Sequence, residues 1–162
     1  MKRDWILAAL LSAALGTLWH FFFDWFPCAL TALLCPVNES VWEHLKLLYF
    51  PPLAIAVFLS LRVRCPQRRF WSGLLAGVLL STALLAGSFY TVTAGFALPS
   101  EPTLDIPLYY ICLFTLWLIA RRLCSSGAAS RALGPLVIAC GVLGAALIVF
   151  SFAAPPLPIF QA

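Results

Sequence analysis

The sequence predicts an all-α polytopic membrane protein with five transmembrane helices, and three observations carry that prediction. Hydrophobic residues make up 63% of the 162 residues, charged residues make up 10%, and the mean hydropathy is +1.00. Such a composition is far from that of soluble globular domains. The apolar residues form five long runs joined by short loops, and the basic residues cluster on one side of those runs. We expect the lipid bilayer as partner and no nucleic-acid-binding role.

Each apolar run is long enough for one helix across a bilayer. The expected spans cover about 5–26, 38–61, 70–96, 104–120 and 133–153, within one transmembrane domain of residues 1–162. The first run lacks a small-x-small cleavage site, so we predict a retained helix rather than a secretory signal. In the second, Pro51 and Pro52 are expected to kink the helix and free backbone carbonyls. No alternation of ten-residue segments indicates a β-barrel.

Small residues recur at four-residue spacing in two of these runs. The third carries Gly73, Gly77 and Ser81, and the fifth carries Gly141 with Ala145. Such spacing lets helix backbones approach closely, and we favour packing within the chain over a dimer face. The sequence does not fix the oligomeric state.

The six cysteines form no C-x-x-C pair and no metal-ligand spacing. We interpret most of them as apolar fillers or unpaired thiols. A disulfide between Cys28 and Cys35, in the first predicted outer loop, is the alternative.

The basic residues define the predicted orientation. Nine of the ten Lys and Arg residues fall on one side of the five-span arrangement: Lys2, Arg3, Arg62, Arg64, Arg68, Arg69, Arg121, Arg122 and Arg131. By the positive-inside rule these segments are cytoplasmic. The amino terminus is then inside and the carboxyl terminus outside.

The segment 38–46 places six polar residues within nine positions at the start of the second span. Ser40 and Glu43 have the spacing of a capping box, and Asn38 is the alternative N-cap. Capping needs only one or two polar residues, however. Ionisable groups at membrane depth are costly and usually functional. Lys46 follows Glu43 by three positions, so we also expect an ion pair between them.

A second polar group ends the first span, where His20 and Asp24 lie four residues apart. A short loop should bring them to the segment 38–46. We predict a divalent metal ion held by His20, Glu39 and His44. In that hypothesis Glu43 is the general base and Asp24 orients His20, as catalytic residues. A metal-free acid–base site and a purely structural polar network are the alternatives.

Further polar residues at the same predicted face complete the candidate site. We expect Asn38, Lys46, Tyr90 and Asp105 to bind a substrate or ion. Asp105 precedes Pro107 and also fits a helix N-cap with proline in the first turn.

The chain resembles a known family of small membrane proteins. The residues that carry the resemblance are His20 to Trp25, Pro36 to Lys46, Tyr90 to Thr93, Asp105 and the proline-rich segment 155–160. Together they are similar to an uncharacterised family of multispanning bacterial membrane proteins that is known only as a domain of unknown function. The resemblance implies a multi-pass protein of the bacterial plasma membrane. It implies no established activity.

The residues therefore carry the functional hypothesis. We expect an outward-facing pocket that binds a metal or other cation and acts on a small or lipid-derived substrate, as an intramembrane hydrolase. The alternatives are a small proton- or ion-coupled transporter or channel component, with Glu39, Glu43 and Lys46 at its binding site, and a structural partner of a membrane complex. Packed apolar residues beneath the pocket would favour the enzyme. A continuous polar path to the arginines would favour transport.

The predicted orientation can be tested by cysteine labelling. With the native cysteines replaced, Ser126→Cys should be protected from an impermeant external thiol reagent, whereas Gln161→Cys should react. Labelling at 126 with protection at 161 would invert the arrangement.

Overall fold

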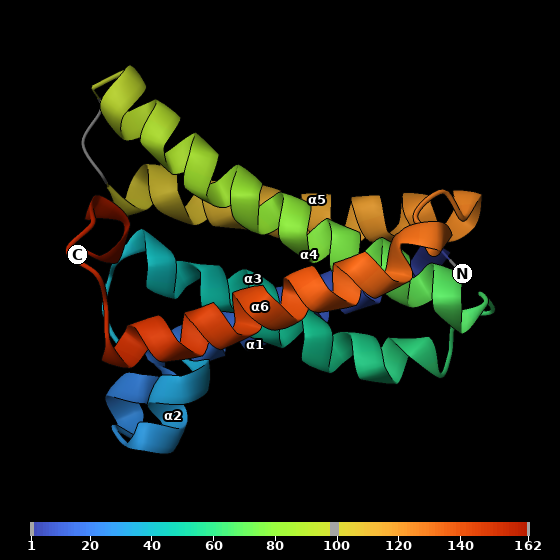
Figure 1. Cartoon of the computed structure of the whole chain (residues 1–162), viewed down its shortest axis with the longest axis horizontal. Coiled ribbons are helices and arrows are strands. Elements are labelled where there is room, and N and C mark those ends of the chain that lie inside the picture. Colours follow the sequence, from blue (N-terminus) through green and yellow to red (C-terminus); the bar gives the residue numbers. More distant parts are fainter. Residues whose placement is uncertain (1, 98–100, 162) are drawn as a thin grey trace.

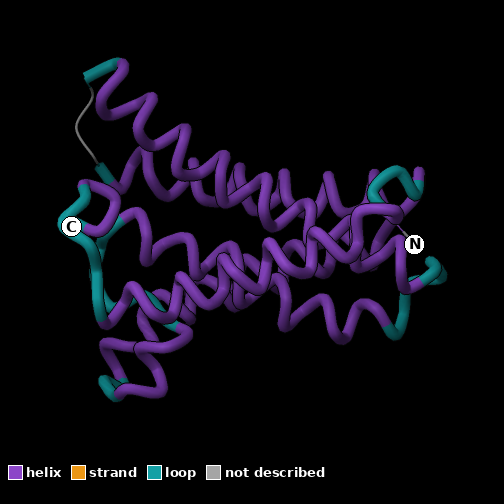
Figure 2. Tube along the Cα trace, in the orientation of Figure 1, coloured by secondary structure: helices purple, strands orange, loops and turns teal. Residues whose placement is uncertain are grey.

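The computed structural model describes residues 2–97 and 101–161, and it contains helices but no strand in these ranges. Figure 2 shows the helices joined by short connections. The five long helices are α1 (Lys2–Trp25), α3 (Val41–Ser60), α4 (Gln67–Tyr90), α5 (Pro102–Ser126) and α6 (Leu133–Phe152). A short helix, α2 (Ala29–Leu34), separates α1 from α3. A π-helical turn, Thr91–Gly95, extends α4. The predicted all-α class is confirmed.

Within the described residues, four helical segments are long and apolar enough to cross a membrane: Arg3–Trp25, Gln67–Gly95, Pro102–Ser126 and Ser130–Phe152. They indicate a membrane protein in a lipid environment. The central helix α3 is not among them, since Glu43, His44 and Lys46 lower its hydropathy. Twelve of its twenty residues are buried, so the other helices cover it. The fifth span and the orientation stay predictions.

The long helices run alternately back and forth, which gives the bundle two distinct ends (Figure 1). One end holds the amino-terminal region and the connections α3–α4 and α5–α6, with the arginines of 62–69 and 121–131; we call it the arginine end. The other holds α2, the connection from α2 to α3 and the carboxyl-terminal segment, and we call it the α2 end. The polar segment 38–46 therefore begins at the α2 end.

Small residues bring α4 and α5 together, and this pair has the most extensive contact in the bundle. A Cβ added at Gly77 would lie 2.7 Å from the Leu116 carbonyl oxygen, and one at Gly73 would lie 2.7 Å from that of Ala120. The predicted use of these glycines for packing within the chain is confirmed. On α6 the close approach is at Gly144, which faces Tyr49, and not at Gly141.

The prolines Pro51 and Pro52 are buried within α3, and the helix continues through them to Ser60. The kink expected there stays a prediction.

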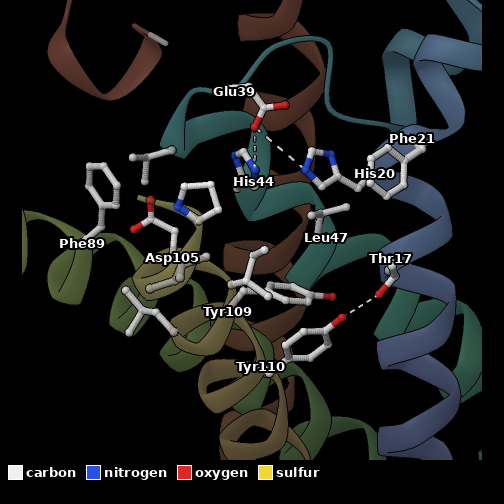
Figure 3. A pocket seen from close by; sticks show the side chains of 16 residues that line it. Thr17, His20, Phe21, Glu39, His44, Leu47, Phe89, Asp105, Tyr109 and Tyr110 are labelled. Carbon is white, nitrogen blue, oxygen red and sulfur yellow. Dashed lines mark hydrogen bonds and ion pairs between the residues drawn. The ribbon is translucent and has the colours of Figure 1, made fainter. Parts of the chain in front are cut away.

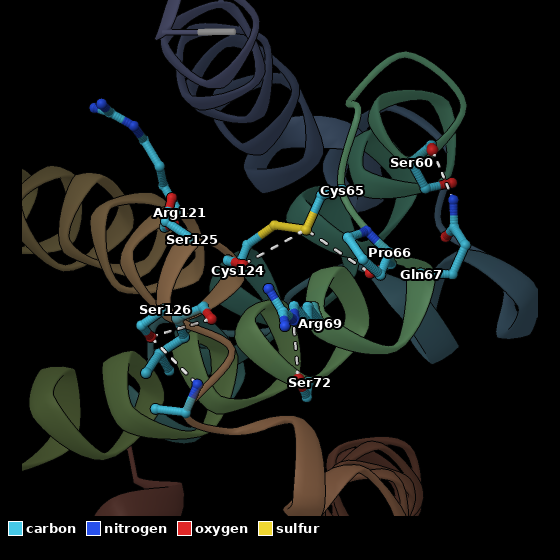
Figure 4. The surroundings of a disulfide bond; sticks show 12 residues. Ser60, Cys65, Pro66, Gln67, Arg69, Ser72, Arg121, Cys124, Ser125 and Ser126 are labelled. Carbon is cyan, nitrogen blue, oxygen red and sulfur yellow. Dashed lines mark hydrogen bonds between the residues drawn. A yellow bond between two sulfur atoms is a disulfide. The ribbon is translucent and has the colours of Figure 1, made fainter.

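A disulfide joins Cys65, between α3 and α4, to Cys124 in α5 at the arginine end (Figure 4). Cys28 and Cys35 are free, so the alternative pairing is wrong. Most of the cysteines are free, as expected: Cys28, Cys35, Cys112 and Cys140. The sequence did not predict the disulfide, because it joins two residues 59 positions apart. Disulfides are rare in reducing compartments. The orientation experiment therefore also decides which compartment this disulfide faces.

The carboxyl-terminal segment folds back onto the start of α3. Phe160 packs against Trp42, with ring centroids 4.9 Å apart, and against Phe150 of α6 at 5.4 Å. Trp42 and Phe150 are themselves 5.6 Å apart. This aromatic contact holds the last turn of α6 beside the polar start of α3.

The packing of α4 on α5 predicts unequal effects of two matched substitutions. Gly77→Ala forces a Cβ against the Leu116 backbone and should lower the free energy of unfolding by about 1–3 kcal/mol. Gly141→Ala, with nothing within 4 Å of its Cβ, should cost nothing. Reversible unfolding by SDS, followed by tryptophan fluorescence, measures both. Equal stability of the two variants would contradict this packing.

Candidate functional site

Local hydrogen bonds fix the start of α3. Ser40 is the N-cap, and its Oγ accepts from the backbone N–H of Glu43 at 3.4 Å. The N–H of Ser40 donates to Asn38 Oδ1 at 2.9 Å. The first half of the predicted capping box is confirmed. In the second half of a capping box the Ser40 N–H would donate to the Glu43 carboxylate, but here it donates to Asn38. The Glu43 carboxylate is therefore free for other partners.

The expected ion pair between Glu43 and Lys46 is confirmed, and it is completely buried. Lys46 Nζ lies 2.8 Å from Glu43 Oε2, with side-chain exposures of 0% and 3%. The same ammonium donates to the carbonyls of Ala32 at 2.8 Å and Cys35 at 3.0 Å. An ammonium has three N–H donors, so all of them are satisfied.

The carboxylate of Glu43 is equally well occupied. Its Oε2 also accepts from the Val37 N–H at 3.0 Å, and its Oε1 accepts from Ser151 Oγ on α6 at 2.6 Å. The ion pair thus joins α2, the α2–α3 connection, α3 and α6. Neither Glu43 nor Lys46 lines the cavity described below. The roles of general base and of ligand-binding residue stay predictions.

Cys35 lies beside this ion pair and is also buried. Burial raises the pKa of its thiol to about 11, although the Lys46 charge opposes that shift. The thiol is therefore protonated near neutral pH and is a poor metal ligand in that form.

Three predicted metal ligands converge at the α2 end. One ligand atom each from His20, Glu39 and His44 lies within 4.8 Å of the other two. Glu39 Oε2 is 3.4 Å from His44 Nε2 and 3.9 Å from His20 Nε2. The two imidazole rings meet edge to face, with centroids 5.1 Å apart. Figure 3 shows both rings below Glu39 at the edge of the cavity.

The backbone determines which nitrogen of His44 faces Glu39. His44 Nδ1 lies 2.9 Å from the Ser40 carbonyl oxygen, which can only accept a hydrogen bond. Nδ1 therefore carries the hydrogen, and in a neutral ring Nε2 carries the lone pair. A lone pair would then face a carboxylate oxygen. That arrangement is favourable only when a proton or metal cation lies between the two.

The remaining predicted residues lie outside this group of three. Asp24 is exposed, and no hydrogen bond or ion pair joins its carboxylate to another residue in the described ranges. Tyr90 ends α4 and stacks edge to face with Phe89, but it does not line the cavity. Asp105 is half-buried and does line it. The orienting role of Asp24 and the binding role of Tyr90 stay predictions.

The three ligands stand at the mouth of a cavity of about 540 Å³. Its walls come from α1, α3, α4 and α5, and most are apolar (Figure 3). The apolar lining residues include Val41, Leu47, Leu85, Phe89, Ile106 and Leu108. Its volume is typical of small-molecule sites.

Sequence reasoning missed two tyrosines of this cavity. Tyr109 is 9% exposed, and its hydroxyl has no hydrogen-bond partner in the part of the chain that the structure describes. Tyr110 is hydrogen-bonded to Thr17 of α1 at 2.8 Å. Because Thr17 donates its own hydrogen to Ala13, Tyr110 is the donor. The one signal available was the adjacency of two tyrosines in an apolar run, which does not reveal which of them faces inward.

Comparison with known proteins identifies the family but no activity. A family model described as "Family of unknown function (DUF6512)" matches residues 1–162. The chain belongs to this family. The expected resemblance to an uncharacterised family is confirmed, whereas the motifs that indicated it stay predictions. No curated protein and no solved structure matches the chain.

The buried ion pair predicts a large difference between two glutamates. Glu43→Gln leaves the Lys46 charge buried without a counter-charge and should lower the free energy of unfolding by about 3–5 kcal/mol. Glu39→Gln, at a side chain 72% exposed, should change it by less than about 0.5 kcal/mol. SDS unfolding compares them. A cost for Glu43→Gln no larger than about 1 kcal/mol would support simple capping instead.

Proposed function

We propose that this chain is a five-span protein of a bacterial plasma membrane that binds a divalent transition-metal ion through His20, Glu39 and His44. The α2 end faces outward in this proposal. The ion sits at the mouth of the cavity and acts on a substrate held there. The convergence of two imidazole nitrogens and one carboxylate oxygen is the observation that carries the proposal.

The spacing of the ligand atoms supports a metal such as Zn²⁺. Ligands bound about 2.1 Å from one tetrahedral ion lie about 3.4 Å from each other. The separations of 3.4 Å and 3.9 Å about Glu39 are close to that value. The three ligand atoms lie within 4.8 Å of one another, so the imidazoles of His20 and His44 have to approach each other, and the exposed Glu39 side chain has to follow them, before all three bind one ion.

The hydrogen bond behind His44 supports the same conclusion. Metal-bound histidines usually donate their second ring N–H to a carbonyl or carboxylate, which fixes the ring and its tautomer. His44 has such a bond from Nδ1 to the Ser40 carbonyl. Its Nε2 is then held toward the other two ligands.

Three protein ligands leave a fourth coordination position for water. Zn²⁺ in such a site lowers the pKa of bound water to about 7 and so supplies hydroxide. We propose hydrolysis of an ester in a lipid-derived substrate. The hydroxide oxygen would bond to the carbonyl carbon and the ester C–O bond would break. The leaving alkoxide would take up the proton that the hydroxide brought, which gives a carboxylate and an alcohol.

The packing beneath the cavity favours this proposal over transport. Leu48, Leu113 and Leu116 are fully buried between the cavity and the arginine end. They belong to an apolar core that continues to Trp5 and Phe70. A polar path from Glu39 to the arginines would have to pass through this core.

Zinc titration of the metal-stripped protein tests the proposal. The wild-type chain should bind about one ion. At a free ion concentration 100 times the Kd, binding should stabilise the fold by about 2.7 kcal/mol. Removal of a group that only hydrogen-bonds to a metal ligand weakens metal affinity about 10- to 100-fold. His20→Ala and His44→Ala each remove a ligand itself, so they should weaken zinc affinity by more than that. Calorimetry and thermal unfolding measure these effects.

Glu101→Gln is the matched control, because Glu101 is an exposed carboxylate at the start of α5. It should bind zinc like the wild-type chain. The proposal would be contradicted if zinc did not stabilise the wild-type chain, or if it stabilised His44→Ala as much as the wild type.

A further inference from the structure

We propose that the cavity holds a single-chain amphiphile that enters from the bilayer between α1 and α5. Its acyl chain lies along the apolar wall, and its oxygen-bearing head lies toward His20, Glu39 and His44. The inference names the substrate class of the proposed function and rests on it only for the orientation of the head. The cavity itself is defined without any metal.

The first observation in support of an amphiphile is the arrangement of polar and apolar groups in the cavity wall. The ionisable lining groups are His20, Glu39, His44, Asp105 and the two tyrosines, and the remaining walls are almost wholly apolar. The Val41, Leu85 and Phe89 side chains would contact water in an empty cavity. Burying apolar ligand surface against them is favourable by roughly 25 cal/mol per Å². An elongated molecule with one polar end matches this lining.

The second observation, which supports entry from the bilayer, is the gap between α1 and α5. Phe21 on α1 and Ile106 on α5 both line the cavity, yet they are 46% and 55% exposed. Their exposed faces lie on helices that are apolar enough to contact lipid. The cavity wall and the lipid-facing surface therefore meet at these two residues. A lipid can reach the cavity there without leaving the bilayer.

The hydrogen bond between Thr17 and Tyr110 closes this gap on one side. It joins α1 to α5 at an exposed position, four residues beyond Ile106 along α5. Figure 3 shows it across the space between the two helices, farther into the bundle than the histidines. An entering chain is thus confined to the part of the gap beside His20 and Phe21.

Tyr109 supplies an independent observation that indicates a ligand. Its hydroxyl is buried and has no partner among residues 2–97 and 101–161, which is costly because a buried polar group has lost its water without a replacement. A Cβ at Gly16 would collide with this hydroxyl, so Gly16 keeps the space beside it free of a side chain. The Tyr109 ring lines the cavity while its hydroxyl lies against Gly16, so the ring has to turn slightly toward the cavity before the hydroxyl donates to an ester oxygen of the amphiphile. A wholly apolar ligand would leave the hydroxyl unsatisfied.

Photo-crosslinking tests the inference in the full chain, reconstituted with Zn²⁺ in phosphatidylcholine nanodiscs. The probe is a monoacylglycerol with a diazirine in its acyl chain, and peptide mass spectrometry locates the adducts. We expect labelling concentrated on Leu47, Leu85 and Phe89, and competed by unmodified monoacylglycerol. Labelling spread evenly over the exposed faces of α1 and α5 would overturn the inference.

A matched pair of tryptophan substitutions tests the entry route. Ile106→Trp fills the gap beside Phe21 and should abolish competable labelling inside the cavity. Ile111→Trp places the same side chain on α5 at a residue that is 60% exposed and outside the cavity, and should leave labelling unchanged. Undiminished labelling in Ile106→Trp, or an equal loss in both, would overturn the route.

Tyr109→Phe tests the head-group contact. Loss of one hydrogen bond should weaken competition by monoacylglycerol about two- to tenfold. Competition by an alkane of equal chain length should be unaffected. Equal effects on both competitors would overturn the contact.

Zinc content measured on the same preparations separates this inference from the proposed function. Competable cavity labelling in a chain that binds no zinc would overturn the metal site alone. Zinc binding with unspecific labelling would overturn only the inference that the cavity holds an amphiphile.

Discussion

The buried ion pair between Glu43 and Lys46 is the interaction on which the α2 end of the protein depends. Two charges at this depth are costly unless each is fully paired. Lys46 has three acceptors for its three hydrogens, and Glu43 has three donors. Those partners are backbone groups of the α2 region and a side chain of α6, so the pair is satisfied only when these elements are in place. His44 is the next residue after Glu43, and Glu39 lies four residues before Glu43, in the α2–α3 connection. The geometry of the candidate metal site therefore depends on a pair that does not belong to it.

The local interactions at the start of α3 could be predicted from the sequence. Ser40 before a helix with Glu43 three positions later is a known N-terminal pattern, and the structure has that cap. The spacing of Glu43 and Lys46 predicted their ion pair. The short connection between the first two predicted helices predicted that His20 would approach the segment 38–46, and His20 does meet Glu39 there. Each inference needed only a few neighbouring residues or one tight connection.

Features that depend on burial or on contacts between distant parts of the chain could not be predicted in this way. The six residues of α2 are too few for a helical period, and Lys46 holds this helix through the Ala32 carbonyl. One hydrogen bond to the ion pair comes from Ser151, which lies 108 positions after Glu43. Tyr109 and Tyr110 are adjacent in an apolar run, and only the packing of α5 on α1 and α4 decides that one is buried and the other bonds Thr17. The disulfide follows from the tight α4–α5 contact, which brings the α3–α4 connection beside the end of α5.

The contact between Ser151 and Glu43 has a consequence for the order of assembly. Chains are synthesised from the amino terminus, so α1, α2 and α3 exist before α6. At that stage Glu43 already has Val37 and Lys46, and His20, Glu39 and His44 are all present. Ser151 is the last partner to arrive, and the aromatic contact of Trp42 with Phe150 and Phe160 forms with it. The amino-terminal third of the chain thus contains every ligand of the candidate metal site, and the carboxyl-terminal helix acts as the closure that seals its supporting charges from water.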